Sequence, residues 1–265
     1  MKMLKTLFLC FFLFYSITNL ADECLELGNP SNAVNNPSNL TNYLMVKNQY
    51  CLSYNSSLNT ANWVAWHLGI NDLGNTKRSN SFVPDQTLPS GWYRVKSSDY
   101  TNSGYDRGHM CPSADRTATP DDNRATFLTT NITPQKPDVN QGPWEKLEEY
   151  ERSLVESGKE LYIYDGIVDS SGYIYTADNH KINVPGDLWK IIVVLDEGTG
   201  DLSRIDNETR VIAVVMPNVV GIRGKDWKAF IQNVDYIEHL TNYDFLSNVP
   251  KQIQEAIEEK NDDEK

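Results

Sequence analysis

The stretch from Ser103 to Arg152 constrains this chain more than any other, because it gathers the residues that can carry chemistry. Asp106, Arg107, Gly108 and His109 follow one another within it. Arg107 is a permanent cation, and His109 can accept a proton near neutral pH. Gly108 has no side chain that would crowd an approaching anion. This pattern favours attack on a phosphate ester.

Asn131 and Asn140 follow, on either side of the segment ITPQKPDV, and a helix is expected from Pro143 to Glu156. Pro143 suits a first helical turn, and Glu148 and Arg152, four residues apart, share one face. The opposite face carries an apolar stripe of Leu147, Tyr150 and Leu154. Each feature alone is more often structural than catalytic, so the interpretation depends on their combination.

In combination, DRGHM and the later TTNITPQKPDVNQGPW-x-x-LE-x-x-x-R resemble the signature of the DNA/RNA non-specific endonuclease family. These are the sugar-non-specific, endonuclease G-like nucleases of the ββα-metal superfamily. The resemblance covers about Trp63 to Leu240, and it includes Arg78-x-x-x-Phe82-x-x-Asp85, Leu188-Trp189-Lys190 and Met216-Pro217-Asn218. It implies an α+β fold with DRGH on one strand, a second strand before Asn131, and the Pro143 helix completing a ββα-metal unit.

The resemblance also implies a metal-dependent endonuclease that hydrolyses DNA and RNA with little sequence preference. His109, with an unperturbed pKa of about 6.5, is the natural base for the attacking water. Asn140 offers a hard, neutral oxygen that suits Mg²⁺, with Mn²⁺ as a substitute. The family places the metal ligand at Asn140, and Glu148 where it orients waters on the metal. Asn131 is expected to hold the His109 ring by a hydrogen bond.

Three arginines, Arg78, Arg107 and Arg152, match the phosphate-binding positions of the family. Arg107 lies inside the motif, whereas Arg78 rests on a looser pattern, so Arg94 competes for its role. The expected catalytic residues are therefore His109, Arg107, Glu148, Arg78 and Asn131.

Two other classes of protein stay open at this point. A metal-dependent phosphatase or phosphodiesterase for small molecules could use the same His, Asn and Glu. A nucleic-acid-binding or adhesion protein with a dead site is the second, although His109, Asn140 and Glu148 are all present. Phosphate contacts carry no base information, so the sequence predicts no preference between DNA and RNA.

The first 21 residues show a secretory signal peptide pattern: two lysines, the apolar run LFLCFFLFYSI and a small residue at Ala21. A membrane anchor is the alternative, but the run has about a dozen residues and a span needs ~20. We therefore expect a secreted or periplasmic protein whose mature form does not reside in a membrane.

The remaining chain is expected to comprise an N-terminal extension (22–60), the endonuclease domain (61–245) and an acidic C-terminal helix or tail (246–265). The net charge of −12 includes two signal lysines, so the chain without them carries −12 − 2 = −14. Such a charge argues against broad electrostatic capture of nucleic acid. Binding must be local, and the segment 74–116 does carry six Lys or Arg against four Asp.

Of the four cysteines, Cys10 lies in the signal segment. In an oxidising compartment, a disulfide from Cys24 to Cys51 would tie the N-terminal segment to the domain and leave Cys111 free. Three cysteines allow three pairings, which the sequence cannot separate. A nucleophilic or metal-binding Cys111 stays open, but no second Cys nearby completes a zinc site, which favours a buried small hydrophobe.

The coarse pattern is mixed, and it fits an α+β fold with a mixed, mainly antiparallel sheet flanked by helices. Strands are expected at 63–68, 125–132, 160–168, 188–195 and 211–216, and helices at 143–156, about 226–240 and 249–259. Several of these strands are almost continuously apolar, so the sheet should be covered on both faces. His67, His180 and His239 lack partners at ligand spacing and are expected to be structural.

Overall fold

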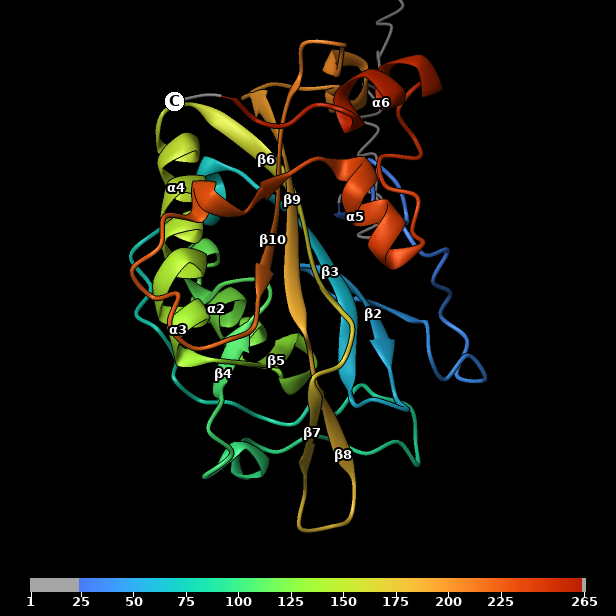
Figure 1. The fold of residues 1–265 in the computed structure, drawn as a ribbon, viewed down its shortest axis with the longest axis vertical. Helices are drawn as coiled ribbons and strands as arrows, with labels where there is room; N and C mark the ends of the chain where they lie inside the picture. The colour runs from blue at the N-terminus through green and yellow to red at the C-terminus, as the bar shows by residue number, and fades with distance from the viewer. Residues whose placement is uncertain (1–23, 264–265) are drawn as a thin grey trace, which may run out of the picture.

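A seven-stranded sheet forms the centre of the protein, whose computed structural model describes residues 24–263 (Figure 1). The sheet has the order β1-β2-β3-β6-β9-β10-β11, with antiparallel pairing throughout. This confirms the α+β class and makes the large sheet wholly antiparallel. The expected signal segment lies outside the described residues. None of the helices within them is long and apolar enough to cross a membrane.

The strands of the sheet are β1 (Tyr43–Val46), β2 (Cys51–Asn55), β3 (Thr60–Leu68), β6 (Lys159–Val168), β9 (Asp187–Asp196), β10 (Arg210–Pro217) and β11 (Ile231–Gln232). The strands expected at 63–68, 160–168, 188–195 and 211–216 are confirmed as β3, β6, β9 and β10. β1 and β2 belong to the expected N-terminal extension, yet they pair into the same sheet as β3.

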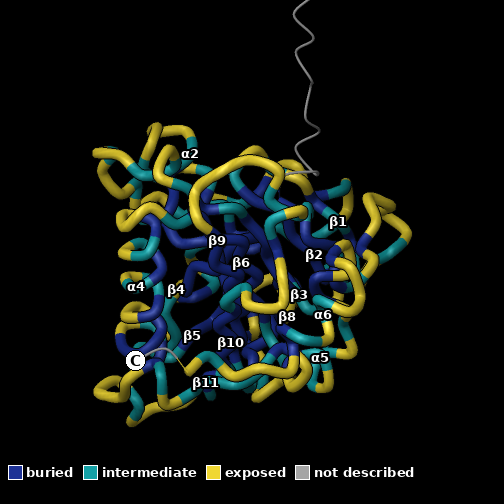
Figure 2. The backbone as a smooth tube through the Cα atoms, turned by 90° about the horizontal axis from the view of Figure 1, so that it is seen from above, coloured by how far each residue is buried: buried dark blue, intermediate teal, exposed yellow. Residues whose placement is uncertain are grey.

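Both faces of the sheet are covered, as the apolar strands predict. Along β3, Val64 and Trp66 join one buried cluster while Trp63 and Ala65 join another. Helix α4 (Glu145–Glu156) packs on the first cluster, and α5 (Val234–Thr241) and α6 (Lys251–Glu258) pack on the second. The buried strands therefore lie between α4 on one side and α5 and α6 on the other (Figure 2).

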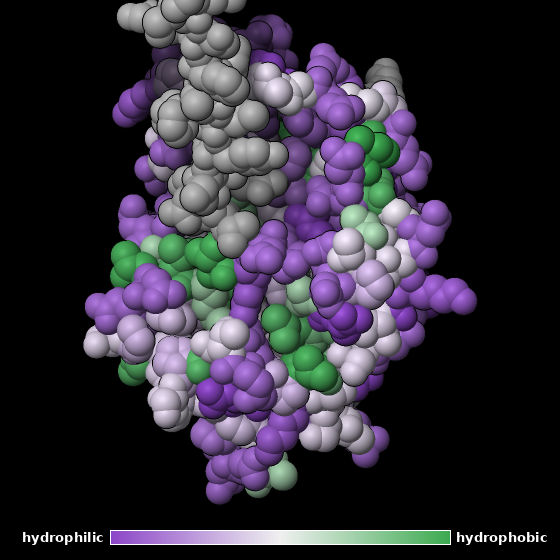
Figure 3. Space-filling view, turned by 180° about the vertical axis from the view of Figure 1, so that it is seen from behind, coloured by the Kyte–Doolittle hydropathy of each residue, from purple (hydrophilic) through white to green (hydrophobic). Residues whose placement is uncertain are grey.

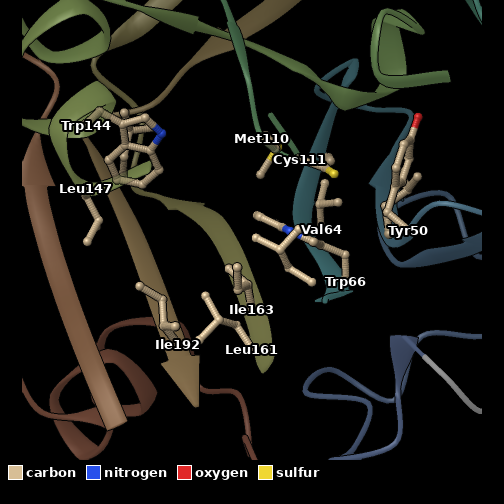
Figure 4. Packing of buried hydrophobic residues seen from close by; sticks show 14 of the residues in the cluster. Tyr50, Val64, Trp66, Met110, Cys111, Trp144, Leu147, Leu161, Ile163 and Ile192 are labelled. Carbon is tan, nitrogen blue, oxygen red and sulfur yellow. The ribbon is translucent and has the colours of Figure 1, made fainter. Parts of the chain in front are cut away.

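The core on the α4 side joins distant parts of the chain (Figure 4). Trp144 and Leu147, at the start of α4, lie in one cluster with Ile192 of β9. Met110 and Cys111, just after β4, lie in the same cluster beside Trp66 of β3. All are fully buried, and such burial contributes about 1.5–3 kcal/mol for each large apolar side chain.

A two-stranded ribbon lies beside α4, formed by β4 (Asp106–His109) and β5 (Ile132–Gln135), with His109 opposite Ile132. The prediction of a strand at 125–132 is wrong, because helix α2 (Pro120–Thr126) occupies its start. The Thr119 hydroxyl caps α2 by accepting from the Asp122 amide, and Pro120 fits its first turn. The second strand of the ββα unit thus follows Asn131 instead of preceding it.

The helix expected from Pro143 begins at Glu145 instead. A short α3 (Pro137–Val139) leads into a π-helical turn over Asn140–Trp144, in which Gly142 leaves helical geometry. A Cβ at Gly142 would lie 2.8 Å from the Cα of Arg223, so only glycine permits this approach of two backbones.

Three further expectations can be compared with the structure. The helix expected at 226–240 is shorter, since Asn233 caps α5 and a 3-10 turn precedes it. The helix expected at 249–259 is confirmed as α6. A hairpin of β7 (Gly172–Tyr175) and β8 (Lys181–Val184), which the sequence did not predict, extends from the lower end of the molecule (Figure 1).

The cysteine expectations are confirmed: Cys24 and Cys51 form a disulfide, and Cys111 is a buried free thiol. Burial raises the pKa of the Cys111 thiol well above its usual range, which keeps it protonated and unreactive. On the face of the molecule in Figure 3, hydrophilic residues predominate and the hydrophobic ones form separate small groups.

Candidate active site

A cavity of about 390 Å³ lies between the β4–β5 ribbon and α4. It brings together six of the seven expected site residues: Arg78, Arg107, His109, Asn140, Glu148 and Arg152. Asn131 does not line it, and neither do His67, His180 or His239. A larger cavity of about 630 Å³, beside β9 and β10, contains no His or Asn among its lining residues and offers no comparable set of groups.

His109 ends β4 with its ring packed against two aromatic rings that also contact each other, Phe82 at 5.4 Å and Phe127 at 4.7 Å. The residue is 7% exposed, and its Nε2 is buried without a hydrogen-bond partner. Burial, assisted by the charge of Arg78, lowers the pKa of His109 to about 3. The ring is therefore neutral at pH 7, as a base must be, and Nδ1 is the nitrogen left to serve the cavity.

The expected hydrogen bond from Asn131 to the His109 ring is wrong. The Asn131 side chain is fully buried and bonds only to backbone: Nδ2 donates to the oxygens of Cys111 and Thr126, and Oδ1 accepts from the Cys111 amide. The Met110 amide also donates to the backbone oxygen of Asn131. Asn131 thus fixes the backbone that follows His109, and its side chain makes no hydrogen bond to the His109 ring.

Gly108 is needed for a reason other than the expected one. A Cβ at this position would lie 2.2 Å from the side chain of Gln135 on β5. Gly108 and Gln135 are both buried. The glycine therefore lets the β4–β5 ribbon close over a buried amide, and it does not serve to keep the approach to the cavity open.

Asn140 meets the requirements of a metal ligand. Its Nδ2 donates to Oδ2 of Asp106 at 2.8 Å, and the side chain of the adjacent Gln141 donates to the same oxygen at 2.7 Å. This contact fixes the orientation of the amide, and Oδ1 of Asn140 accepts no hydrogen bond from residues 24–263. A hard oxygen is thereby left free for a cation such as Mg²⁺.

Glu148, in the first turn of α4, lines the same cavity. Burial raises the pKa of its carboxyl to about 8, although the charge of Lys190 acts against this shift. A cation held beside Asn140 would favour the ionised carboxylate. The donors present are thus an amide oxygen and a carboxylate, which fit a hard divalent ion and not a soft one.

Two of the three arginines rest on aromatic rings at the ribbon side of the cavity. Arg78 lies 5.0 Å from the Phe127 ring centre and donates to Ser113 Oγ at 2.6 Å. Arg107 lies 4.9 Å from the Phe82 ring centre and donates to Ser97 Oγ. Both cations face the cavity. The competing Arg94 instead donates to the backbone oxygen of Leu88 and does not line the cavity.

Arg152, on α4, is held in place by an ion pair with Asp115. Its Nη1 donates to Oδ1 of Asp115 at 2.9 Å, and the Asp115 side chain is fully buried. The other oxygen of Asp115 accepts from Trp66 Nε1 at 3.2 Å. Burial opposes the charge of Arg152, but the carboxylates of Asp115 and Glu148 outweigh it and raise the pKa of Arg152. The guanidinium therefore stays charged at the cavity wall.

A layer of buried charge, which the sequence analysis missed, lies beneath α4. Lys190 of β9 is 0% exposed, with its Nζ 3.2 Å from Glu151 and 3.9 Å from Asp165. Its ammonium also lies 4.7 Å from the Trp144 ring centre. Burial raises the pKa of Glu151 to about 7 and that of Asp165 well above its usual range. A lysine within the apolar run LWKIIVVL was the available signal.

Known proteins resemble this chain in sequence and in fold. The sequence model of the DNA/RNA non-specific endonucleases matches residues 27–252. A nuclease from Nostoc sp. is 55% identical over 240 residues, which cover 90% of this chain and 85% of that protein. A nuclease from Serratia marcescens is 28% identical over 233 residues, covering 83% and 81%. A crystal structure of the EndoG/EndoGI complex, at 21% identity, matches with a TM-score of 0.72 over 89% of this chain and 95% of that one, which shows the shared fold.

Proposed function

The chain belongs to the DNA/RNA non-specific endonuclease family, and we propose that it hydrolyses phosphodiester bonds of DNA and RNA with little sequence preference. The observation that carries the proposal is one cavity that combines a neutral histidine, a free amide oxygen and three arginines. Hydrolysis needs a base for water and positive charge around the phosphate, and these residues supply both.

In this proposal His109 is the general base. Because the ring is neutral at pH 7, it can take a proton from a water that approaches Nδ1. Phe82 and Phe127 hold the ring in place and exclude bulk water from its other edge. A positioned base of this kind contributes about 10²–10⁴ in rate.

Asn140 is the proposed metal ligand, with Asp106 orienting its amide and Glu148 facing the waters that complete the coordination. Mg²⁺ suits this set, because it takes few protein ligands and keeps several waters, and Mn²⁺ could substitute. When bound, the ion would supply positive charge to the reacting phosphate and to the departing oxygen.

Arg78, Arg107 and Arg152 are the proposed phosphate contacts. All three line the cavity, and each is held by a hydrogen bond that fixes where its charge lies. Contacts to phosphate oxygens carry no sequence information. Because the expected substrate contacts are to phosphate, we expect cleavage without sequence preference.

The direct test is incubation of the protein with circular DNA, with RNA and with a small nucleotide phosphodiester, each with Mg²⁺, with Mn²⁺ or with chelator. We expect both polymers to be cut internally and the chelator to stop cleavage. Efficient turnover of the small diester with no cleavage of polymer would instead support a small-molecule phosphodiesterase.

We further propose that the protein is exported to a secreted or periplasmic location. The signal-like pattern of residues 1–21 and the Cys24–Cys51 disulfide both support an oxidising destination. Mass spectrometry of the protein from cells and from the surrounding medium tests this. Intact Met1 on an exclusively intracellular protein would contradict it.

A further inference from the structure

Helices α5 and α6 lie on the side of the sheet away from α4 (Figure 1). Three of their carboxylates converge there. Asp235 and Glu238 lie one turn apart on α5, and Glu258 ends α6. One oxygen from each lies within 4.8 Å of the others. This cluster lies on the second core cluster and shares no residue with the nuclease cavity.

Glu258 sets this cluster apart from an ordinary acidic surface. The residue is 4% exposed, and its Oε1 is buried without a hydrogen-bond partner. It also occupies the last turn of α6, where the helix dipole disfavours negative charge. Burial raises the pKa of Glu258 to about 8, and the charges of Glu238, Asp235 and Asp244 act in the same direction. A buried oxygen placed so unfavourably requires a partner.

Within residues 24–263, no ion pair with a basic side chain supplies that partner. Among the ion pairs of residues 24–263, none reaches Asp235, Glu238 or Glu258. The lysines at the two ends of α6 are engaged elsewhere: Lys251, its first residue, pairs with Glu255, and Lys260, just after its end, donates to the backbone oxygen of Asn207. Glu238 is only partly satisfied, because one of its oxygens accepts from the Phe245 amide.

The geometry points to a calcium ion: we propose that Asp235, Glu238 and Glu258 bind Ca²⁺ between α5 and α6. An ion at about 2.4 Å from each ligand spans oxygens up to roughly 4.8 Å apart, and the three oxygens lie within this limit. Ca²⁺ accepts irregular sets of six to eight oxygens, whereas Mg²⁺ demands a near-ideal octahedron at shorter distances. With only carboxylates present, zinc and other softer metals are disfavoured.

The ion would fasten the last helix of the chain. Ile253 and Ile257 of α6 pack on the second core cluster, which includes Val234 and Ile237 of α5. Carboxylates of both helices repel one another without a cation and bridge the helices with one. A ligand that binds only the folded state stabilises it by mass action. Calcium should therefore raise the thermal stability of the protein through this contact.

The test follows thermal unfolding of the full chain in the Asn140→Ala background, which removes the proposed ligand of the catalytic metal. After treatment with a chelating resin, CaCl₂ should raise Tm by roughly 5–10 °C when present at about a hundred times its Kd. Calorimetric titration should show one bound Ca²⁺ per chain. Adding Glu258→Gln should abolish both signals, while Glu255→Gln, an exposed acid on the same helix, should preserve them.

Asp235→Asn, at the exposed edge of the cluster, provides a second variant that leaves the buried packing intact, and it should weaken calcium binding several-fold. If the Asn140→Ala protein shows no calcium response at pH 7.5 and Glu258→Gln is as stable or more stable, Glu258 is a protonated acid and the proposal is overturned. A calcium response that survives Glu258→Gln would also overturn it, because the ion would then bind elsewhere.

Discussion

The two walls of the nuclease cavity are built in different ways. On the ribbon wall, Arg107 and His109 are placed by strand pairing between β4 and β5 and by the aromatic rings of Phe82 and Phe127. On the helix wall, Arg152 is placed by a chain of buried polar contacts through Asp115. Beneath it, Lys190 compensates buried carboxylates. The ribbon wall thus depends on packing, whereas the helix wall depends on charge compensation.

The largest effect is expected on the ribbon wall. His109→Ala should lower kcat by about 10²–10⁴, since a general base acts in the transition state and little in the ground state. Binding of DNA, measured with chelator by fluorescence anisotropy, should stay close to that of the parent. Turnover near the parental rate at neutral pH would show that another group is the base.

The next effect tests the helix wall. Lys190→Met should cost about 3–5 kcal/mol, because it leaves Glu151 and Asp165 buried without a cation. Tm should fall by roughly 10 °C. The pKa of Asp165 is already raised, and loss of the lysine would raise it further. The folded variant would then hold more protons than the unfolded chain, so its destabilisation should be smaller at pH 5 than at pH 8.

Lys146→Met is the matched control, since this exposed lysine of α4 donates only to the backbone oxygen of Lys225. Its Tm should stay within about 2 °C of the parent. Equal loss of stability in both variants would show that the buried layer does not depend on charge compensation.

At the start of the helix wall, Asn140→Ala should lower activity and raise the Mg²⁺ concentration for half-maximal rate by about tenfold or more. The physical reason is the loss of the Asn140 amide oxygen, which Asp106 orients and which accepts no hydrogen bond from residues 24–263. Titration of the cleavage rate with MgCl₂ measures this. An unchanged Mg²⁺ requirement would move the ligand elsewhere in the cavity.

A smaller effect is expected on the salt dependence of DNA binding, and it can be measured for an arginine of each wall. Each phosphate contact contributes about 0.9 to the salt slope of duplex binding, so three arginines predict a log-log slope of about −3. Arg107→Ala and Arg152→Ala should each reduce its magnitude by about one, for every DNA sequence alike. Only Arg152→Ala should also lower Tm, since it leaves the buried Asp115 without its partner. A slope near −10 would reveal a larger contact surface.

The last prediction is that the His109 ring does not titrate near neutral pH. Burial lowers the pKa of His109 to about 3, so its ring resonances should not titrate between pH 5 and 8. Because the folded pKa lies below the unfolded value of about 6.5, the stability that this neutral ring contributes is present above pH 6.5 and is lost as pH falls toward 3. Nuclear magnetic resonance can follow these ring resonances against pH, with His109→Ala used to assign them. A titration midpoint near pH 6.5 would contradict the prediction.

The difference between the walls also explains what the sequence could predict. The cavity residues that line up along one short segment, such as His109, Asn140 and Glu148, were identified by their spacing and by the family resemblance. Asn131 was assigned the wrong partner, because the direction of its side chain depends on how the backbone after His109 turns. The sequence therefore predicted which residues line the cavity, but it did not predict the hydrogen-bond partners of their neighbour Asn131.

The helix wall was not predictable in the same way. Asp115 lies 37 residues from Arg152, and Lys190 lies on the far strand β9, so no local pattern connects them. The strand expected at 125–132 was wrong because a residue outside that segment decides its conformation. Its β-branched residues suit a strand, but the cap at Thr119 directs the first of them into α2.

The anchoring of Arg152 has a consequence for protein engineering. Residues 106–152 form a contiguous cassette that holds most of the cavity. Grafting this cassette onto another scaffold would transfer the proposed base His109, the amide oxygen of Asn140 and two of the three cavity arginines. The graft would lack Trp66 of β3 and Lys190 of β9, which complete the support beneath α4. A transplanted cassette of this kind would need a recipient sheet that supplies an indole donor and a buried cation at those two places.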